Sequence, residues 1–239
     1  IPAVSPMYYW IAYSVGFTVE YIFVFIISCF ITQRSHDTLK DIYASNRHIK
    51  TIQHKMISSF ANLVEGRDSF TGEHIKRTAI YVELISRELV NQGYYKDILT
   101  EENIQLFINT APLHDLGKIR IPDQILCKPS SFTQEEYEIM KTHSYEGYKL
   151  IDENLSDIES EEFLEVAKIM SLYHHEKWDG TGYPNKVKGH DIPLCARIMA
   201  AADVLDALLS KRQYKAAMSL EQALDIFKKS KGSHFEPCI

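Results

Sequence analysis

Seven imidazole and carboxylate side chains, far apart in the chain, have the chemistry of metal ligands. They are His74, His114, Asp115, His143, His174, His175 and Asp203. Nitrogen and oxygen ligands without a thiolate suit Fe, Mn, Zn, Ni or Co better than Mg, which prefers oxygen. Seven ligands exceed what one ion holds beside an open position, so the set predicts two divalent ions about 3.5–4 Å apart that share a carboxylate. Asp115 is the natural bridge between them.

Asp203 is the most informative of these residues. Alanines and aliphatic residues surround it in "IMAAADVLDALL", so we expect its side chain to be buried. A buried carboxylate is costly unless it pairs with a cation or binds a metal. An ordinary salt bridge to Arg197 or Arg212 is the alternative. Asp206, one turn later, is interpreted as a structural residue. His114 and Asp115 in "PLHDLGK" could also be a simple capping and hydrogen-bonding pair.

Three basic residues could add positive charge to such a centre. Lys118, Arg212 and Lys215 would do so if they face it, although each alone is more often a solvated surface charge. The chain as a whole carries a net charge of −6, which argues against polymeric nucleic acid as a partner. A positive cavity in an acidic protein suits a phosphate ester, because it stabilises charge that develops on the phosphoryl oxygens.

The elements that must position these residues are predicted to be helical. Apolar residues recur with helical spacing, and no stretch alternates with period two for long enough to form a strand. Capping boxes are expected at Thr133 with Glu136 and at Ser219 with Gln222, and Pro193 is expected at the first position of a further helix. The chain is therefore predicted to be all-α.

The start of the chain is apolar enough to enter a membrane. Residues 7–32 carry Glu20 as their only charge, and twelve Ile, Val and Phe residues lie between Ile11 and Ile31. These contribute roughly −4 to −7 kcal/mol to insertion, against about +3 kcal/mol for one central acid. A transmembrane segment is predicted for residues 1–32, as the end of a longer N-terminal region, with a buried core helix or an amphipathic first helix as the alternatives. Since Lys and Arg appear only afterwards, we expect a cell-membrane protein whose remaining part is cytoplasmic.

Residues 33–58 are predicted to form a linker or signalling helix. Apolar residues repeat every seven positions from this segment onward, at Ile42, Ile49, Met56 and Leu63. Ile52 adds an apolar residue at the second core position of the heptad. This spacing is typical of a short coiled coil and would permit a homodimer. A helix that packs on its own domain explains the pattern equally well.

The motifs "HDLGK" and "HHEKWDGTGYP" resemble those of the HD-GYP family, a branch of the HD metal-dependent phosphohydrolases. The resemblance extends from about Ile57 to Pro237 through "RDSFTGEHIKR", "MKTHSYEG" and "HFEP". It implies an HD-type helical bundle over residues 59–239, with the seven residues as metal ligands and Fe or Mn as the foremost metals. It also implies a bacterial signalling enzyme that hydrolyses cyclic di-GMP to pGpG and GMP.

The resemblance assigns roles to residues around the metals. Lys118 would contact the scissile phosphate and assist the leaving group, while Arg212 and Lys215 would grip the substrate phosphates. The loop that contains Gly180, Gly182 and Tyr183 would form a lip beside the pocket. Family loops of this kind are linked to contacts with diguanylate cyclases (GGDEF proteins), and Tyr183 could contact substrate, a partner or only its own loop.

Two departures from the family pattern affect these expectations. Some members hold a third metal through a glutamate at the position of Phe70, so two metals are predicted here. The family continues with more helix after the end of this chain, so the phosphohydrolase domain is expected to be incomplete at its C-terminus. A catalytically silent cyclic-dinucleotide receptor, a phosphodiesterase for another cyclic dinucleotide, and a membrane-anchored structural bundle are the alternative functions.

Overall fold

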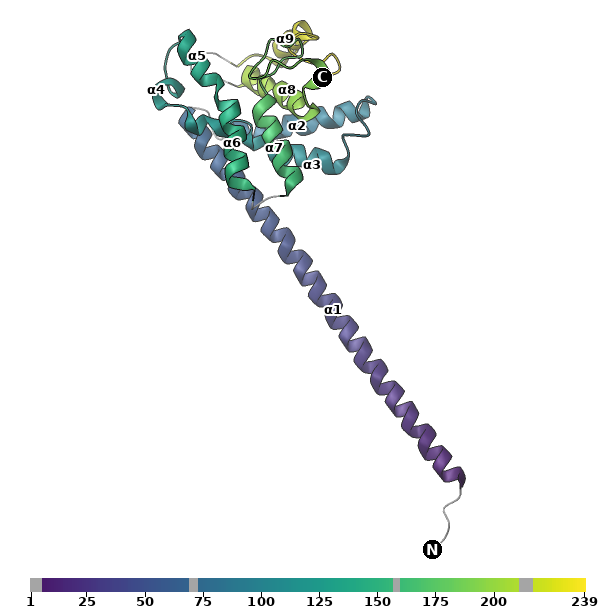
Figure 1. Cartoon of the computed structure of the whole chain (residues 1–239). Helices are drawn as coiled ribbons and strands as arrows, with labels where there is room; N and C mark the ends of the chain where they lie inside the picture. The colour runs from purple at the N-terminus through teal and green to yellow at the C-terminus, as the bar shows by residue number, and fades with distance from the viewer. Residues whose placement is uncertain (1–5, 69–72, 157–159, 211–216) are drawn as a thin grey trace. The chain divides into compact units, whose positions relative to one another are not determined.

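The computed structural model describes residues 6–68, 73–156, 160–210 and 217–239 (Figure 1). Within these ranges there are helices and one isolated bridge, between Lys231 and Phe235, but no strand. The prediction of an all-α protein is therefore confirmed. The chain divides into two compact units, Ile1–Gln53 and His54–Ile239.

The described helices follow one another with short connections. They are α1 (Pro6–Glu65), α2 (His74–Asn91), α3 (Glu101–Thr110), α4 (Asp123–Leu126), α5 (Gln134–Lys141), α6 (His143–Leu155), α7 (Glu161–Tyr173), α8 (Leu194–Leu209) and α9 (Leu220–Ser230). Short 3-10 helices lie between some of them: η1 (Gly66–Asp68), η2 (Ala111–Leu113), η3 (Leu116–Arg120) and η4 (Gly189–Asp191).

Local capping explains where several of these helices begin. Both predicted capping boxes are confirmed, at Thr133 for α5 and at Ser219 for α9, and each satisfies two main-chain N–H groups that the helix leaves free. Thr100 caps α3 in a similar way by accepting from the Asn103 amide. Pro193 lies one position before the first residue of α8, as its N-cap, rather than at the first helical position.

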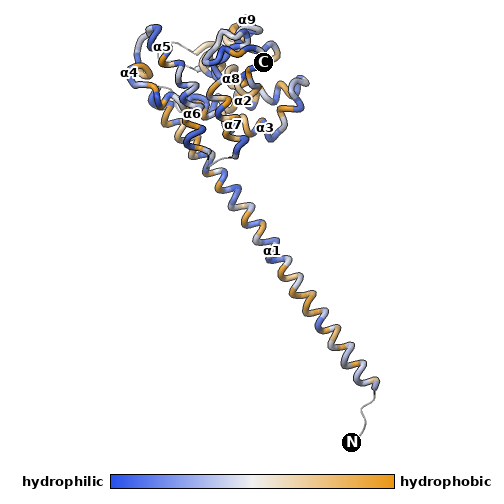
Figure 2. The backbone as a smooth tube through the Cα atoms, in the orientation of Figure 1, coloured by the Kyte–Doolittle hydropathy of each residue, from blue (hydrophilic) through white to orange (hydrophobic). Residues whose placement is uncertain are grey.

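The first unit consists of the N-terminal part of α1. This helix is the one described element that is long and apolar enough to cross a membrane. Its apolar residues are concentrated in its N-terminal half, as the orange stretch in Figure 2 shows. The residues of the predicted heptad stripe are exposed on α1: Ile42, Ile49, Ile52, Met56 and Leu63.

The largest apolar core of the second unit joins four helices. Val82 and Leu89 of α2, Phe107 of α3, Met170 of α7 and Ile198 of α8 are among its buried members. Burial of a large aliphatic or aromatic side chain stabilises a fold by about 1.5–3 kcal/mol. This core therefore fixes α2, α7 and α8, from which several of the predicted ligands come.

A second apolar cluster holds the last turns of α1 against α6 and α7. Ile57 of α1 packs there with Leu113 of η2, Ile151 of α6 and Phe163 of α7. Met56 and Leu63, by contrast, remain exposed. The end of α1 thus packs on its own domain through one face and leaves the heptad face uncovered.

Two glycines bring η3 and α6 into direct backbone contact. A Cβ atom on Gly117 would lie 1.9 Å from the main-chain oxygen of His143 and 2.4 Å from the nitrogen of Gly147. A Cβ atom on Gly147 would lie 2.2 Å from Ser171 Oγ of α7. Because no side chain fits at either position, the residues around Gly117 can approach the start of α6.

Candidate metal centre

The predicted ligands lie mostly at the ends of helices, where side chains from different elements can meet. His74 is the first residue of α2 and His143 is the first residue of α6. His174 caps the C-terminal end of α7. His114 and Asp115 lie between η2 and η3.

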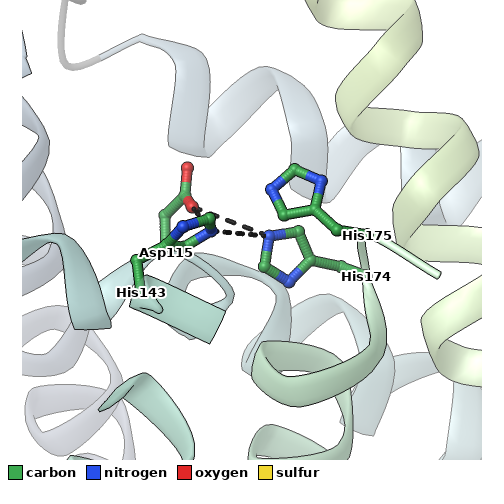
Figure 3. A group of neighbouring side chains, drawn as sticks. All are labelled: Asp115, His143, His174 and His175. Carbon is green, nitrogen blue, oxygen red and sulfur yellow. Dashed lines mark hydrogen bonds and ion pairs between the residues drawn. The ribbon is translucent and has the colours of Figure 1, made fainter. Parts of the chain in front are cut away.

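The structure brings all seven predicted ligands into two groups of donor atoms. One group consists of Asp115, His143, His174 and His175 (Figure 3), and the other of His74, His114 and Asp203. Within each group the donor atoms lie within 4.8 Å of one another. The two groups meet at Asp115, since its Oδ2 lies 3.2 Å from Nε2 of His114.

Asp115 lies at the middle of this arrangement. Its Oδ1 is 3.2 Å from Nε2 of His143 and 3.7 Å from Nε2 of His174. Its Oδ2 is 2.8 Å from Nζ of Lys118. One oxygen of Asp115 therefore faces His143 and His174, and the other faces His114. A carboxylate that bridges two metal ions requires this placement.

Three of the imidazoles have their Nδ1 protons committed to the main chain. A carbonyl oxygen of the preceding turn accepts this proton at 2.8 Å for His114, 2.7 Å for His143 and 2.9 Å for His174. Since a carbonyl oxygen only accepts, Nδ1 must donate, and in the neutral ring Nε2 presents its lone pair. The Nε2 atoms of His143 and His174 lie only 3.4 Å apart (Figure 3). Two lone pairs at that distance favour a cation between them.

Burial sets the charge state of the paired histidines. It lowers the pKa of His174, and it lowers the pKa of His175 well below the ordinary value, with the neighbouring imidazoles adding to the effect. Both side chains are therefore neutral at neutral pH. The neutral imidazole is the form that binds a metal.

The pair His114 and Asp115 attracts positive charge. Burial works against the charged form of each residue, but the carboxylate outweighs it and raises the pKa of His114 to about 9. Lys118 and His114 likewise hold the pKa of Asp115 well below its usual range in spite of burial. Among the described residues, His114 Nε2 and Asp115 Oδ1 are nevertheless buried without a hydrogen bond. A metal ion would displace the Nε2 proton of His114 and satisfy both atoms, so the donor set fits first-row transition ions.

Asp203 differs from its sequence prediction in burial. Its side chain is 20% exposed, and Oδ1 lies 3.8 Å from Nε2 of His74. The expectation of a buried position was wrong because Asp203 lies at the edge of the α8 core, on the side of the histidines. Of the two alternative partners, Arg197 pairs with Glu236 instead, and Arg212 lies outside the described residues, as do Lys215 and Phe70.

Asp206, which the sequence interpretation treated as a structural residue, contacts the predicted ligand His74 directly. It is fully buried and accepts the Nδ1 proton of His74 at 2.6 Å. Arg77 donates to the same carboxylate at 2.6 Å and 3.0 Å. The arrangement fixes the ring of His74 with Nε2 toward the centre, as carboxylates behind metal-binding histidines commonly do. The spacing of Asp206, one turn from Asp203 on the same helix, was the available indication.

Glu65 was also missed. It is the last residue of α1, and its donor atoms group with those of His74 and Asp115 within 4.8 Å. Oε1 lies 3.1 Å from Nε2 of His74. In the sequence, Glu65 follows the packed residues Ala61 and Val64 with helical spacing, which indicates an inward-facing position.

The loop after His175 closes over one side of the centre. The ring of Tyr183 lies 4.7 Å from the ring of His175 and 6.4 Å from that of His143, between centroids. Glu176 is buried and accepts from the amides of Asn185 and Lys186 at 2.7 Å and 2.9 Å. Tyr183 thus contacts a predicted ligand directly, and Glu176 ties down the loop that carries it.

The two glycines of this loop have different roles. Gly180 has a φ of +82°, in the left-handed region that favours glycine. Gly182 does not have a positive φ; a Cβ atom there would instead lie 2.5 Å from Cα of Glu176 and 2.6 Å from the oxygen of His175. Close approach of the backbone, rather than freedom in φ, explains glycine at position 182.

Comparison with known proteins defines the class to which this fold and centre belong. The HD domain family matches residues 62–239, and the chain belongs to this family. A solved structure of a cyclic GMP-AMP specific phosphodiesterase from V. cholerae, V-cGAP3, has a TM-score of 0.52 at 21% identity, over 76% of this chain and 46% of that one. It supports the fold alone.

Two curated relatives from Vibrio cholerae are similar in sequence. A cyclic di-GMP phosphodiesterase is 42% identical over 205 residues, which are 86% of this chain and 42% of the relative. A 3'3'-cGAMP-specific phosphodiesterase 2 is 40% identical over 183 residues, which are 77% of this chain and 33% of the relative. The chain therefore spans less than half the length of these two relatives.

Proposed function

We propose that the chain is an HD-GYP phosphodiesterase that hydrolyses cyclic di-GMP to pGpG and GMP in bacterial signalling. The observation that carries this proposal is the meeting of two donor groups at Asp115, with Nζ of Lys118 at 2.8 Å from the same carboxylate. The name of the 42% identical relative supports cyclic di-GMP as the substrate.

The seven predicted residues would hold two divalent ions, Fe or Mn first, with Zn, Ni or Co as alternatives. When bound, such ions lower the pKa of water and polarise phosphoryl oxygens. The chain itself contributes orientation and charge. Asp115 aligns the two groups, and Lys118 is placed to offset negative charge on the departing ribose 3′-oxygen. The ring of Tyr183 lies against that of His175, and Tyr183 is proposed to contact the substrate.

Outside the described residues, Arg212 and Lys215 are proposed to hold the phosphates of the dinucleotide. Their guanidinium and ammonium groups suit this role, because phosphate oxygens accept charge-assisted hydrogen bonds from both. Alanine at either position should raise KM for cyclic di-GMP with little change in bound metal, whereas loss of bound metal would refute the assignment.

The proposal is tested with the purified chain in detergent, loaded with Mn²⁺ or Fe²⁺ under anaerobic conditions. We expect conversion of cyclic di-GMP to pGpG and GMP, measured by chromatography, and loss of conversion in Asp115→Ala. Asp97→Ala, at an exposed turn away from the centre, is the matched control and should keep full activity. Undiminished activity in Asp115→Ala would reject the assignment of the centre.

Two other functions make distinct predictions in the same assay. The similarity to a 3'3'-cGAMP-specific phosphodiesterase favours a mixed cyclic dinucleotide as the second candidate substrate, and kcat/KM for both compounds side by side separates the two. A cyclic-dinucleotide receptor would bind the ligand without turnover.

The location and partners of the chain are further parts of the proposal. Residues 7–32 of α1 are proposed to anchor it in the cell membrane with the HD domain in the cytoplasm, which is supported by the length and apolar character of this helix. The exposed stripe from Ile42 to Leu63 is proposed to pair two copies of the chain. The loop with Tyr183 and Pro184 is the proposed contact for diguanylate cyclases.

A further inference from the structure

The carboxylate of Glu65 is buried at the end of α1 without a hydrogen-bond donor. Its side chain is 3% exposed, and neither oxygen accepts a hydrogen bond from any described residue. A carboxylate removed from water requires a proton or a cation to replace its lost hydration.

The geometry of His74 favours a cation over a proton as the partner of the Glu65 carboxylate. Nδ1 of His74 donates to Asp206 at 2.6 Å. Nε2 lies 3.1 Å from Oε1 of Glu65, yet the contact does not have hydrogen-bond geometry. A ring nitrogen and a carboxylate oxygen at this distance, outside hydrogen-bond geometry, are spaced as two ligands of one cation would be.

A third donor completes the arrangement. Asp115 offers an oxygen within 4.8 Å of the donor atoms of both Glu65 and His74. Carboxylate oxygens and an imidazole nitrogen are ordinary partners of Mn, Fe or Zn. We propose that Glu65 is a further metal ligand, which acts with His74 and Asp115, so that α1 ends inside the metal centre. The inference rests on the metal centre proposed above.

The position of Glu65 on α1 gives this ligand a mechanical consequence. Ile57 and Ala61 are buried on the same side of the helix, about two turns and one turn before Glu65, and the buried Val64 directly precedes it. Ile57 belongs to the same apolar cluster as Leu113, which directly precedes His114. A shift or rotation of the last turns of α1 would therefore withdraw the Glu65 carboxylate from the centre. Metal occupancy on the His74 side would then depend on the position of α1.

The test is a Mn²⁺ titration of the full chain in detergent, with free Mn²⁺ followed by electron paramagnetic resonance. Glu65→Gln keeps the shape of the side chain and removes its charge. We expect it to weaken one class of Mn²⁺ site by at least about tenfold, as loss of a group around a metal typically does. Glu73→Gln is the matched control, because Glu73 precedes His74 and is 79% exposed; its titration should equal that of the wild type.

Thermal unfolding separates a metal ligand from a purely structural residue. In chelator, Glu65→Gln should unfold at the same temperature as the wild type or higher, because the substitution removes an uncompensated buried charge. Saturating Mn²⁺ should raise its Tm less than that of the wild type, since a ligand that binds the folded state stabilises it in proportion to its affinity. A lower Tm in chelator together with an equal Mn²⁺ shift would overturn the proposal.

The outcome for Glu65 can be read independently of the proposed enzymatic function. Equal Mn²⁺ affinities of wild type and Glu65→Gln, in a preparation that cleaves cyclic di-GMP, would overturn the Glu65 ligand and leave the function intact. Weakened Mn²⁺ binding in a chain that cleaves no cyclic dinucleotide would support the ligand and refute the function.

Discussion

Substitution of Asp206 tests whether the arrangement behind His74 stabilises both the fold and the metal centre. This carboxylate is fully buried and accepts from His74 Nδ1, from two nitrogens of Arg77 and from Ser210 Oγ. Burial would raise its pKa, but His74 and Arg77 outweigh burial and lower it to about 2 from the ordinary value of 3.8. The difference corresponds to about 2–2.5 kcal/mol of stability.

The sign of this contribution follows from the depressed pKa. It is fully present above about pH 4 and is lost as the pH falls toward about 2, where the folded protein also takes up the proton. Asp206→Ala should therefore lower the free energy of unfolding at pH 7 by about 3–4 kcal/mol, because it also leaves His74 without its acceptor. Arg77 is 29% exposed and can be rehydrated, which keeps the loss below the upper end of the range for buried pairs.

The assay is urea unfolding in chelator, followed by a Mn²⁺ titration of the folded variant. We expect Mn²⁺ affinity to fall about 10–100-fold, because the ring of His74 is no longer held in place. Asp225→Ala is the matched control: this aspartate is 59% exposed in a surface pair with Lys229, and its loss should change stability by less than about 1 kcal/mol. Unchanged stability and unchanged Mn²⁺ affinity in Asp206→Ala would refute the reasoning.

Three further substitutions test the elements that position the centre. Gly117→Ala should lower stability by about 1–3 kcal/mol and weaken Mn²⁺ binding, because its Cβ atom would lie 1.9 Å from the oxygen of His143; urea unfolding and a Mn²⁺ titration measure the two effects. Glu176→Ala should speed hydrogen exchange of the amides of Asn185 and Lys186, which lose their acceptor, and should raise KM more than it lowers kcat; unaltered exchange at both amides would contradict the loop assignment. Thr133→Ala should cost about 1 kcal/mol in thermal or urea unfolding without changing Mn²⁺ binding, since it removes only the cap of α5.

Sequence patterns predicted the parts of this molecule that depend on neighbouring residues. The capping box at Thr133 involves contacts across three positions, so its residue types suffice to predict it. The helical character of the chain followed from the spacing of apolar residues in the same way. The seven predicted ligands were a different case: motif resemblance grouped them, and the fold then placed their donor atoms together.

The residues that were missed depend on contacts between distant elements. Asp203 and Asp206 lie one turn apart on the same alanine-rich helix, and composition does not tell which one meets His74 through Nδ1. Asp206 does so only because α2 packs beside α8, and Arg77 comes with α2. Glu65 reaches the centre because Ile57 holds the end of α1 against a cluster formed by residues far along the chain. A pattern of neighbouring residues cannot predict such contacts, because they join residues that are far apart in the sequence.

The central claim is that two groups of histidines and carboxylates hold metal ions that share Asp115. Anomalous diffraction from crystals grown with Mn²⁺ tests it most directly. The account predicts anomalous peaks on both sides of the Asp115 carboxylate, within about 2.0–2.3 Å of its oxygens and of the histidine Nε2 atoms. Crystals that bind Mn²⁺ elsewhere, with no peak within reach of Asp115, would contradict it.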